Sequence, residues 1–193
     1  MKKTFLIIFC FLFMCNTLLA DDKNDAKMMI KSKIDSAISV LQNEDLKKEE
    51  SNEKIIGIVS PVFNFGLIAK LSMGKTNWQK LSSDNKKRFV DLFENRMKSS
   101  YLEKLNMYTN ESINYGEPIQ EGRKVQVPTE LISKDNKINM IYKLYKSKGL
   151  WKIYDLEVEG VSVVKTYKTQ FDEVLKKGTV ENLMKELEKP ESE

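Results

Sequence analysis

The chain of 193 residues contains no histidine, and its only cysteines are Cys10 and Cys15. The lack of histidine excludes Ser/His and Cys/His catalytic pairs, histidine acid/base catalysis and zinc sites of the usual composition. Both cysteines lie in the first 20 residues, so a chain that loses this segment has no disulfide and no thiol chemistry. We therefore expect no metal, no cofactor and no catalytic residue.

The sequence also lacks an excess of either charge. It has 32 basic and 28 acidic residues, and the two kinds are interspersed along the chain. This pattern is typical of a solvated surface and gives no indication of a nucleic-acid partner. The sequence has no glycine-rich nucleotide-binding loop. If the function of the protein requires energy from nucleotide hydrolysis, a partner protein has to supply it.

The first 20 residues have the pattern of a secretory signal peptide. Lys2-Lys3 precedes an apolar run from Phe5 to Met14, and Leu18-Leu19-Ala20 stands before the acidic Asp21. We predict export and cleavage after Ala20. An uncleaved anchor is the weaker alternative, because the apolar run is shorter than the roughly 20 residues that span a bilayer. Lipidation of Cys15 is disfavoured because a bulky residue precedes it.

Cleavage would leave residues 21–193, a length that suits a single domain with a sizeable core. The first part of this region has helical spacing, and Asp25 is placed to cap a first helix. Residues 43–53 are charged and poor in apolar side chains, and we interpret them as a helix end and a surface loop. A second helical region is expected over 54–60. The longest helix begins at Ser82 and keeps one apolar face as far as Tyr108.

Four strand-like runs follow, at 112–116, 124–131, 137–146 and 150–158, with turn residues between them. Two of them have one clearly apolar face, made of Val125, Val127 and Leu131 in the second run and of Ile138, Met140, Tyr142 and Leu144 in the third. One side of the sheet is therefore expected to be covered. Pro128 predicts that the second strand lies at an edge or is interrupted.

The densest signal lies in residues 150–171. The apolar residues Trp151 and Ile153 are at odd positions, whereas Leu156 and Val158 are at even ones. The strand period of two therefore changes phase near residues 154–155, which predicts a bulge or bend. Gly160 permits a sharp turn, and helical spacing follows from residue 161, before a short C-terminal helix over 179–187. Helices followed by an antiparallel meander indicate the α+β class.

Two separated regions resemble the MlaC family, the periplasmic phospholipid shuttles also called toluene-tolerance proteins. In the first region, Trp151 to Asp155, Glu159 to Val164, and Tyr167, Gln170 and Phe171 fit the family pattern, with Thr166 and Lys168 as mild departures. In the second region, Pro61-Val62-Phe63-Asn64-Phe65 is followed by Leu67 to Leu71, Gly74 and Trp78. Asn64 stands where the family usually has Asp, and an Asn can still cap a helix.

The resemblance implies a curved antiparallel sheet of about four strands, wrapped by helices into a cone related to nuclear-transport-factor-like folds. It implies a single lipid-carrier domain over 21–193 that shuttles phospholipid between the outer and inner membranes of the periplasm and maintains outer-membrane asymmetry in the Mla pathway. Implied partners are an inner-membrane ABC-transporter complex with a lipid-binding subunit and an outer-membrane lipoprotein complex. The phospholipid itself is cargo.

A carrier must enclose its lipid tails, because burial is worth ~0.8 kcal/mol per CH₂. We expect a dry apolar cavity between the sheet and the long helix. Cavity lining and core look alike in a sequence, so either role is open for each apolar residue. The predicted tail contacts are Phe63, Phe65, Val127, Met140, Tyr142, Leu156 and Val161.

Two other classes of function are weighed against the carrier. An acid/base enzyme on the same cone would use an Asp and a Tyr in an apolar pocket, and Tyr154 adjoins Asp155. Neighbours in a strand point to opposite faces, so these two side chains share a pocket only if the bend reorients them. A periplasmic chaperone or secreted adhesin fits export and charge but makes no use of the two matched regions.

Overall fold

The computed structural model describes residues 17–105, 112–132 and 136–189. The helical N-terminal half contains α1 (Thr17–Leu41), α2 (Lys48–Val59), the 3-10 turn η1 (Ser60–Val62), α3 (Phe65–Met73), α4 (Lys75–Lys80) and α5 (Ser83–Leu105). The C-terminal half contains β1 (Ser112–Tyr115), β2 (Ile119–Glu121), β3 (Lys124–Ile132), β4 (Lys137–Ser147), β5 (Leu150–Val158), β6 (Val161–Ser162), α6 (Val163–Lys177) and α7 (Val180–Glu188). Among these described helices, none is long and apolar enough to cross a membrane.

The strands form one antiparallel sheet in the order β1-β3-β4-β5-β6, and β2 also pairs with β3. This sheet, with helices packed against it, confirms the α+β prediction. The four predicted strands are present, and β2 and β6 are short additions that the sequence pattern did not reveal.

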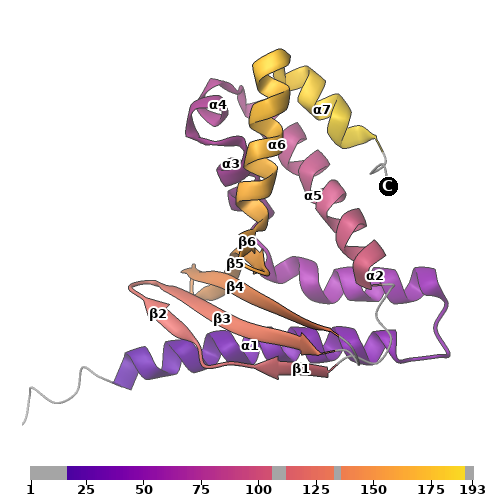
Figure 1. Cartoon of the computed structure of the whole chain (residues 1–193), viewed down its shortest axis with the longest axis vertical. Coiled ribbons are helices and arrows are strands. Elements are labelled where there is room, and N and C mark those ends of the chain that lie inside the picture. The colour runs from indigo at the N-terminus through magenta and orange to yellow at the C-terminus, as the bar shows by residue number, and fades with distance from the viewer. Residues whose placement is uncertain (1–16, 106–111, 133–135, 190–193) are drawn as a thin grey trace, which may run out of the picture.

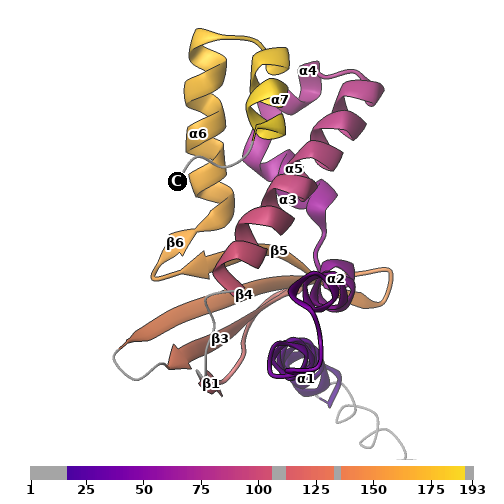
Figure 2. The same cartoon turned by 90° about the vertical axis from the view of Figure 1, so that its right-hand side faces the viewer.

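The helices form two groups around the sheet (Figures 1 and 2). α1 and α2 lie side by side along one side of it, whereas α3 to α7 form a helical layer beyond its β5–β6 edge. Each group has its own buried cluster. The helical core contains Met73, Phe89, Phe93, Phe171 and Met184, and the sheet core contains Ala26, Ile30, Val125, Val127, Leu144 and Ile153. Phe63 packs against both clusters.

Two predicted helix starts are wrong. α1 begins at Thr17, so Asp25 lies inside this helix and does not cap it. The preceding Leu and Ala residues are good helix formers, which explains the earlier start. α2 begins at Lys48, within the segment that we interpreted as a surface loop. Lys and Glu also favour helix formation. The charged, apolar-poor residues at the start of α2 therefore form an exposed part of this helix and not a loop.

The predicted start of the longest helix is confirmed, since the hydroxyl of Ser82 accepts a hydrogen bond from the backbone N–H of Asn85 at 3.2 Å. The predicted apolar run at 5–14 and the predicted helix end at Tyr108 lie outside the described residues.

Pro128 lies in β3, which is an interior strand with β4 on one side and β1 and β2 on the other. The predicted edge position is therefore wrong, and so is the predicted interruption, because β3 is continuous over Lys124–Ile132 and the gap lies between its neighbours β1 and β2. The carbonyl of Pro128 accepts a hydrogen bond from Gly116 at 2.9 Å, in the segment that separates β1 from β2. A proline is tolerated here because its missing N–H faces a gap between strands.

The predicted bulge in β5 is confirmed. Lys143 of β4 pairs with Asp155, but the next residue, Leu144, pairs with Ile153, so Tyr154 is the extra residue. This shift places Ile153 and Leu156 on the same face of the sheet. Without it, Leu156 and Val158 would turn away from the side that the helices cover.

Candidate functional site: an apolar cavity between the two cores

A cavity of about 780 Å³ lies between the sheet and the surrounding helices. Its walls come from both groups of helices and from the sheet: Ile34, Ile38 and Leu41 of α1, Ile55, Ile56 and Val59 of α2, Met97 of α5, Leu131, Ile138, Met140 and Val158 of the sheet, and Val163 and Tyr167 of α6. The volume is within the ~300–1,000 Å³ of ordinary ligand pockets. The walls are mostly apolar, so the cavity suits hydrocarbon.

Six of the seven predicted tail contacts line this cavity, namely Phe63, Phe65, Met140, Tyr142, Leu156 and Val161. Val161 is 59% exposed and therefore lies where the cavity meets solvent. The structure thus brings together residues from η1–α3, β4, β5 and β6. Their contact with lipid stays a prediction.

Val127 is the exception, because it is fully buried in the sheet core and does not line the cavity. It shares the inward face of β3 with Leu131, as its spacing predicts, and Leu131 does line the cavity. The first half of α1 explains the difference. Ala26 and Ile30 pack in the same cluster as Val127, so this end of the sheet is filled by α1.

The segment between η1 and α3 joins the two cores beside the cavity. The rings of Phe63 and Phe65 stack with centroids 5.6 Å apart. Between them, the backbone N–H of Asn64 donates to the carbonyl of Ile153 at 2.9 Å, which ties this segment to β5. The Asn64 side chain accepts a hydrogen bond from Leu67 N–H at 3.0 Å and so caps α3, as predicted, and it also donates to the Tyr145 hydroxyl.

Asp155 connects the bulge to the start of α6. Its carboxylate accepts hydrogen bonds from the Ser162 hydroxyl at 2.8 Å and from the Val164 backbone N–H at 3.1 Å. Ser162 in turn caps α6 by accepting from Lys165 N–H at 3.1 Å. The ammonium of Lys143 lies 3.5 Å from the same carboxylate. Asp155 is therefore a buried structural group that holds α6 against the sheet.

Neither Asp155 nor Tyr154 is among the residues that line the cavity. The Tyr154 ring contacts Tyr145 and lies under the ammonium of Lys124, on the strand face that alternates with the cavity side. The bulge does bring the two side chains to one face, but it is the face away from the cavity.

Burial raises the pKa of the Tyr142 phenol to about 12. The Tyr142 phenol ionises near pH 10 in the unfolded chain and near pH 12 in the folded chain. Its contribution to the free energy of unfolding is therefore complete below pH 10 and is lost as the pH rises from 10 to 12. Two pKa units correspond to about 2 to 3 kcal/mol. We expect the unfolding free energy of the wild type to fall by this amount relative to Tyr142→Phe between pH 10 and 12. Parallel pH curves for the two proteins, in urea unfolding, would contradict the burial of this phenol.

The sequence pattern did not identify the contribution of α1 and α2 to the cavity. Their apolar residues repeat at helical spacing, which is typical of any core-facing helix. The pattern also missed two cations in the lining, Lys33 and Lys98. The hydroxyl of Ser60 lines the cavity as well and has no hydrogen-bond partner among the described residues.

The comparisons with known proteins agree with this geometry. A family model, described as MlaC protein, matches residues 31–189, which is more than half of the chain. The chain belongs to the MlaC family. Membership confirms the resemblance of the two regions around Phe63 and Trp151. None of the curated proteins that were compared matches the chain.

The MlaC-family fold is also found in a solved structure, a phospholipid-binding protein from Ralstonia solanacearum in complex with a phospholipid. The two chains superpose with a TM-score of 0.74 and share 21% sequence identity. The match covers 84% of this chain and 94% of the other. At this identity, the likeness shows that the two proteins share a fold.

Proposed function

We propose that this MlaC-family protein binds a phospholipid by its acyl tails and carries it between two membranes. The observation that carries the proposal is the largely apolar cavity of about 780 Å³ between the sheet and the two groups of helices. A tail of about 16 carbons left in water costs on the order of 12 kcal/mol, so a carrier has to enclose it. The structural neighbour was solved in complex with a phospholipid, which supports the proposal that this protein also binds one.

The finer parts of the proposal rest on family membership. Transport would run through the periplasm between the outer and inner membranes and would maintain outer-membrane lipid asymmetry. The partners would be an inner-membrane ABC-transporter complex with a lipid-binding subunit and an outer-membrane lipoprotein complex. Export would use the signal peptide at residues 1–20, with the mature domain beginning at Asp21.

An acid/base enzyme on this fold has no comparable support. The candidate pair, Tyr154 and Asp155, does not line the cavity, and the Asp155 carboxylate is occupied by Ser162, Val164 and Lys143. The family and the structural neighbour both favour a lipid carrier.

Native mass spectrometry of the protein purified from the periplasm tests the proposal. We expect a polypeptide mass that begins at Asp21, with one phospholipid bound noncovalently and released by organic solvent. Transfer of labelled phospholipid from donor to acceptor vesicles should then require the protein. A protein that is lipid-free from every membrane source and transfers no lipid would contradict the carrier function. A mass that includes acylated Cys15 would contradict cleavage after Ala20.

A further inference from the structure

The lining of the cavity carries charge of one sign only. Among the described residues, its charged members are Lys33 on α1 and Lys98 on α5, and no Asp or Glu lines it. The other polar members are hydroxyl and amide side chains, and the remainder are apolar. An ammonium group beside an apolar wall is stabilised by an anion nearby, because it has lost part of its hydration.

Lys33 has no ion-pair partner in the part of the chain that the structure describes. It is half-buried, and the neighbours at helical spacing on α1 are Met29, Ile30, Ser36 and Ala37, none of which is acidic. The nearby acid, Asp35, is already occupied. It accepts a hydrogen bond from Lys31 at 2.8 Å and another from the Tyr115 hydroxyl at 2.9 Å. The positive charge of Lys33 is therefore available to a ligand.

Lys98 supplies the second cation from the opposite group of helices. Its ammonium lies 5.6 Å from the centroid of the Phe65 ring and 2.5 Å from the carboxylate of Glu94. These contacts hold it next to the stacked phenylalanines of the cavity wall. Because Glu94 already neutralises part of its charge, Lys98 is expected to contribute less than Lys33.

We propose that Lys33, assisted by Lys98, binds the phosphate of the lipid whose tails fill the cavity, so that the protein selects phospholipids over uncharged diacyl lipids. The inference rests on the proposed function. Apolar walls alone cannot make this distinction, since both kinds of lipid have the same tails. A lysine ammonium binds phosphate as a point charge through charge-assisted hydrogen bonds, which are stronger than neutral ones.

The test is a competition between two lipids with identical acyl chains. The delipidated full protein is incubated with vesicles that contain equal amounts of phosphatidylglycerol and diacylglycerol, and native mass spectrometry gives the ratio of the two bound lipids. We expect the wild type to be enriched in phosphatidylglycerol. In Lys33→Met the ratio of bound phosphatidylglycerol to bound diacylglycerol should fall about tenfold, as for the loss of one charged hydrogen bond. In Lys98→Met this ratio should fall less, and in Lys33→Arg it should stay at the wild-type value.

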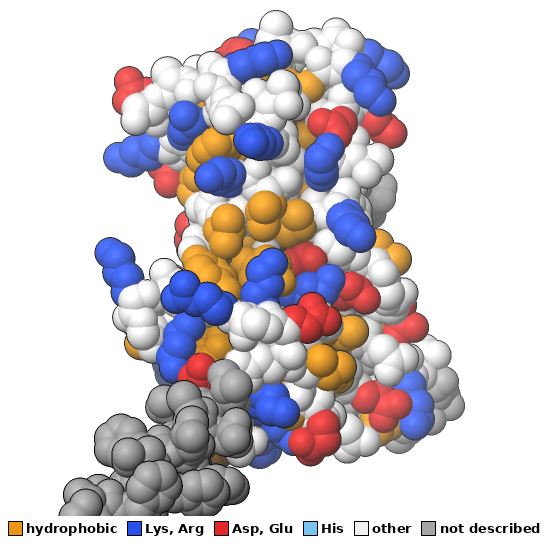
Figure 3. Space-filling view, turned by 90° about the vertical axis from the view of Figure 1, so that its left-hand side faces the viewer, with side chains coloured by type: hydrophobic (Ala, Val, Ile, Leu, Met, Phe, Trp, Pro, Cys, Tyr) orange, Lys and Arg blue, Asp and Glu red, His pale blue; other side chains and the backbone are white. Residues whose placement is uncertain are grey.

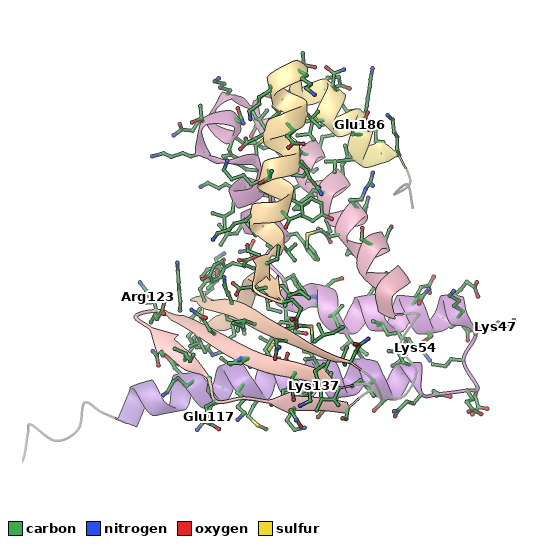
Figure 4. All side chains as sticks on the ribbon, viewed as in Figure 1. Lys47, Lys54, Glu117, Arg123, Lys137 and Glu186 are labelled. Carbon is green, nitrogen blue, oxygen red and sulfur yellow. The ribbon has the colours of Figure 1, made fainter. Side chains whose placement is uncertain are left out.

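Lys54→Met is the matched control, because Lys54 is exposed on α2 and does not line the cavity (Figure 4). Lys and Arg are spread over the molecular surface, as Figure 3 shows for one face, so a general charge effect has to be separated from a local one. An unchanged ratio in Lys33→Met, or an equal fall in Lys54→Met, would overturn the inference. Displacement of phosphatidylglycerol by millimolar glycerol phosphate would also overturn it and indicate a site for soluble phosphate. Failure of the wild type to bind either lipid would instead reject the proposed function.

Discussion

Asp155→Ala is expected to lower the free energy of unfolding by about 3 to 4 kcal/mol. The substitution leaves the Ser162 hydroxyl and the Val164 N–H without their acceptor, at a site that is 7% exposed. It also leaves Lys143 with Glu157 as its remaining carboxylate, at 2.6 Å. For a domain of this size the change corresponds to a fall of about 10 °C in melting temperature.

Urea unfolding followed by far-UV circular dichroism measures this effect. The control is Asp172→Ala, which removes an exposed ion pair with Lys168 on α6 and is expected to cost less than about 0.5 kcal/mol. Asp155→Asn keeps one acceptor oxygen, so its free energy of unfolding should lie between those of Asp155→Ala and Asp172→Ala. Equal stabilities for Asp155→Ala and Asp172→Ala would show that the carboxylate does not hold α6 against the sheet.

Met140→Trp is expected to reduce lipid binding strongly while the domain stays folded. Met140 lines the cavity, so a larger side chain can occupy space that a tail would otherwise fill. If the indole displaces about two methylene groups, the lost burial is about 1.6 kcal/mol, or about fifteenfold in affinity. Adding Ile38→Trp from the α1 wall should deepen the loss. Native mass spectrometry of each variant, loaded from the same vesicles, gives the occupancy.

Val127→Trp is the matched comparison for this prediction. Val127 lies two residues before Thr129, the β3 partner of Met140, but it belongs to the close-packed sheet core. Overpacking there should destabilise the fold by about 1 to 3 kcal/mol, whereas Met140→Trp should be close to wild type in stability. If both variants lose stability alike and Met140→Trp binds lipid normally when folded, the space beside Met140 is not where the tails lie.

Several local features of this fold were predictable because each depends on neighbouring residues in the chain. The phase change between Ile153 and Leu156 requires a bulge, and the structure has one at Tyr154. Asn64 and Ser82 cap helices, since short polar side chains reach the first free N–H groups. The alternation of Ile138, Met140, Tyr142 and Leu144 correctly predicted one inward face of β4.

What that inward face contacts was not predictable. Met140 and Tyr142 face the cavity, whereas Leu144 on the same strand face lies in the sheet core. The difference is set by α1, which fills one end of the sheet with Ala26 and Ile30 and lines the cavity with Ile34, Ile38 and Leu41. Periodicity reports that a side chain is turned inward, but it contains no information about the distance to the opposite wall.

The sequence by itself therefore determined the four main strands, the inward faces of β3 and β4, the bulge and several of the helix starts, because hydrogen bonding and side-chain alternation act over a few residues. It also indicated the MlaC family through two short regions. Only the tertiary structure decided which inward residues enclose empty space and which fill a core, and only it placed Lys33 and Lys98 on one apolar cavity. These properties depend on how helices and strands distant in the chain pack together, and a local pattern does not specify that packing.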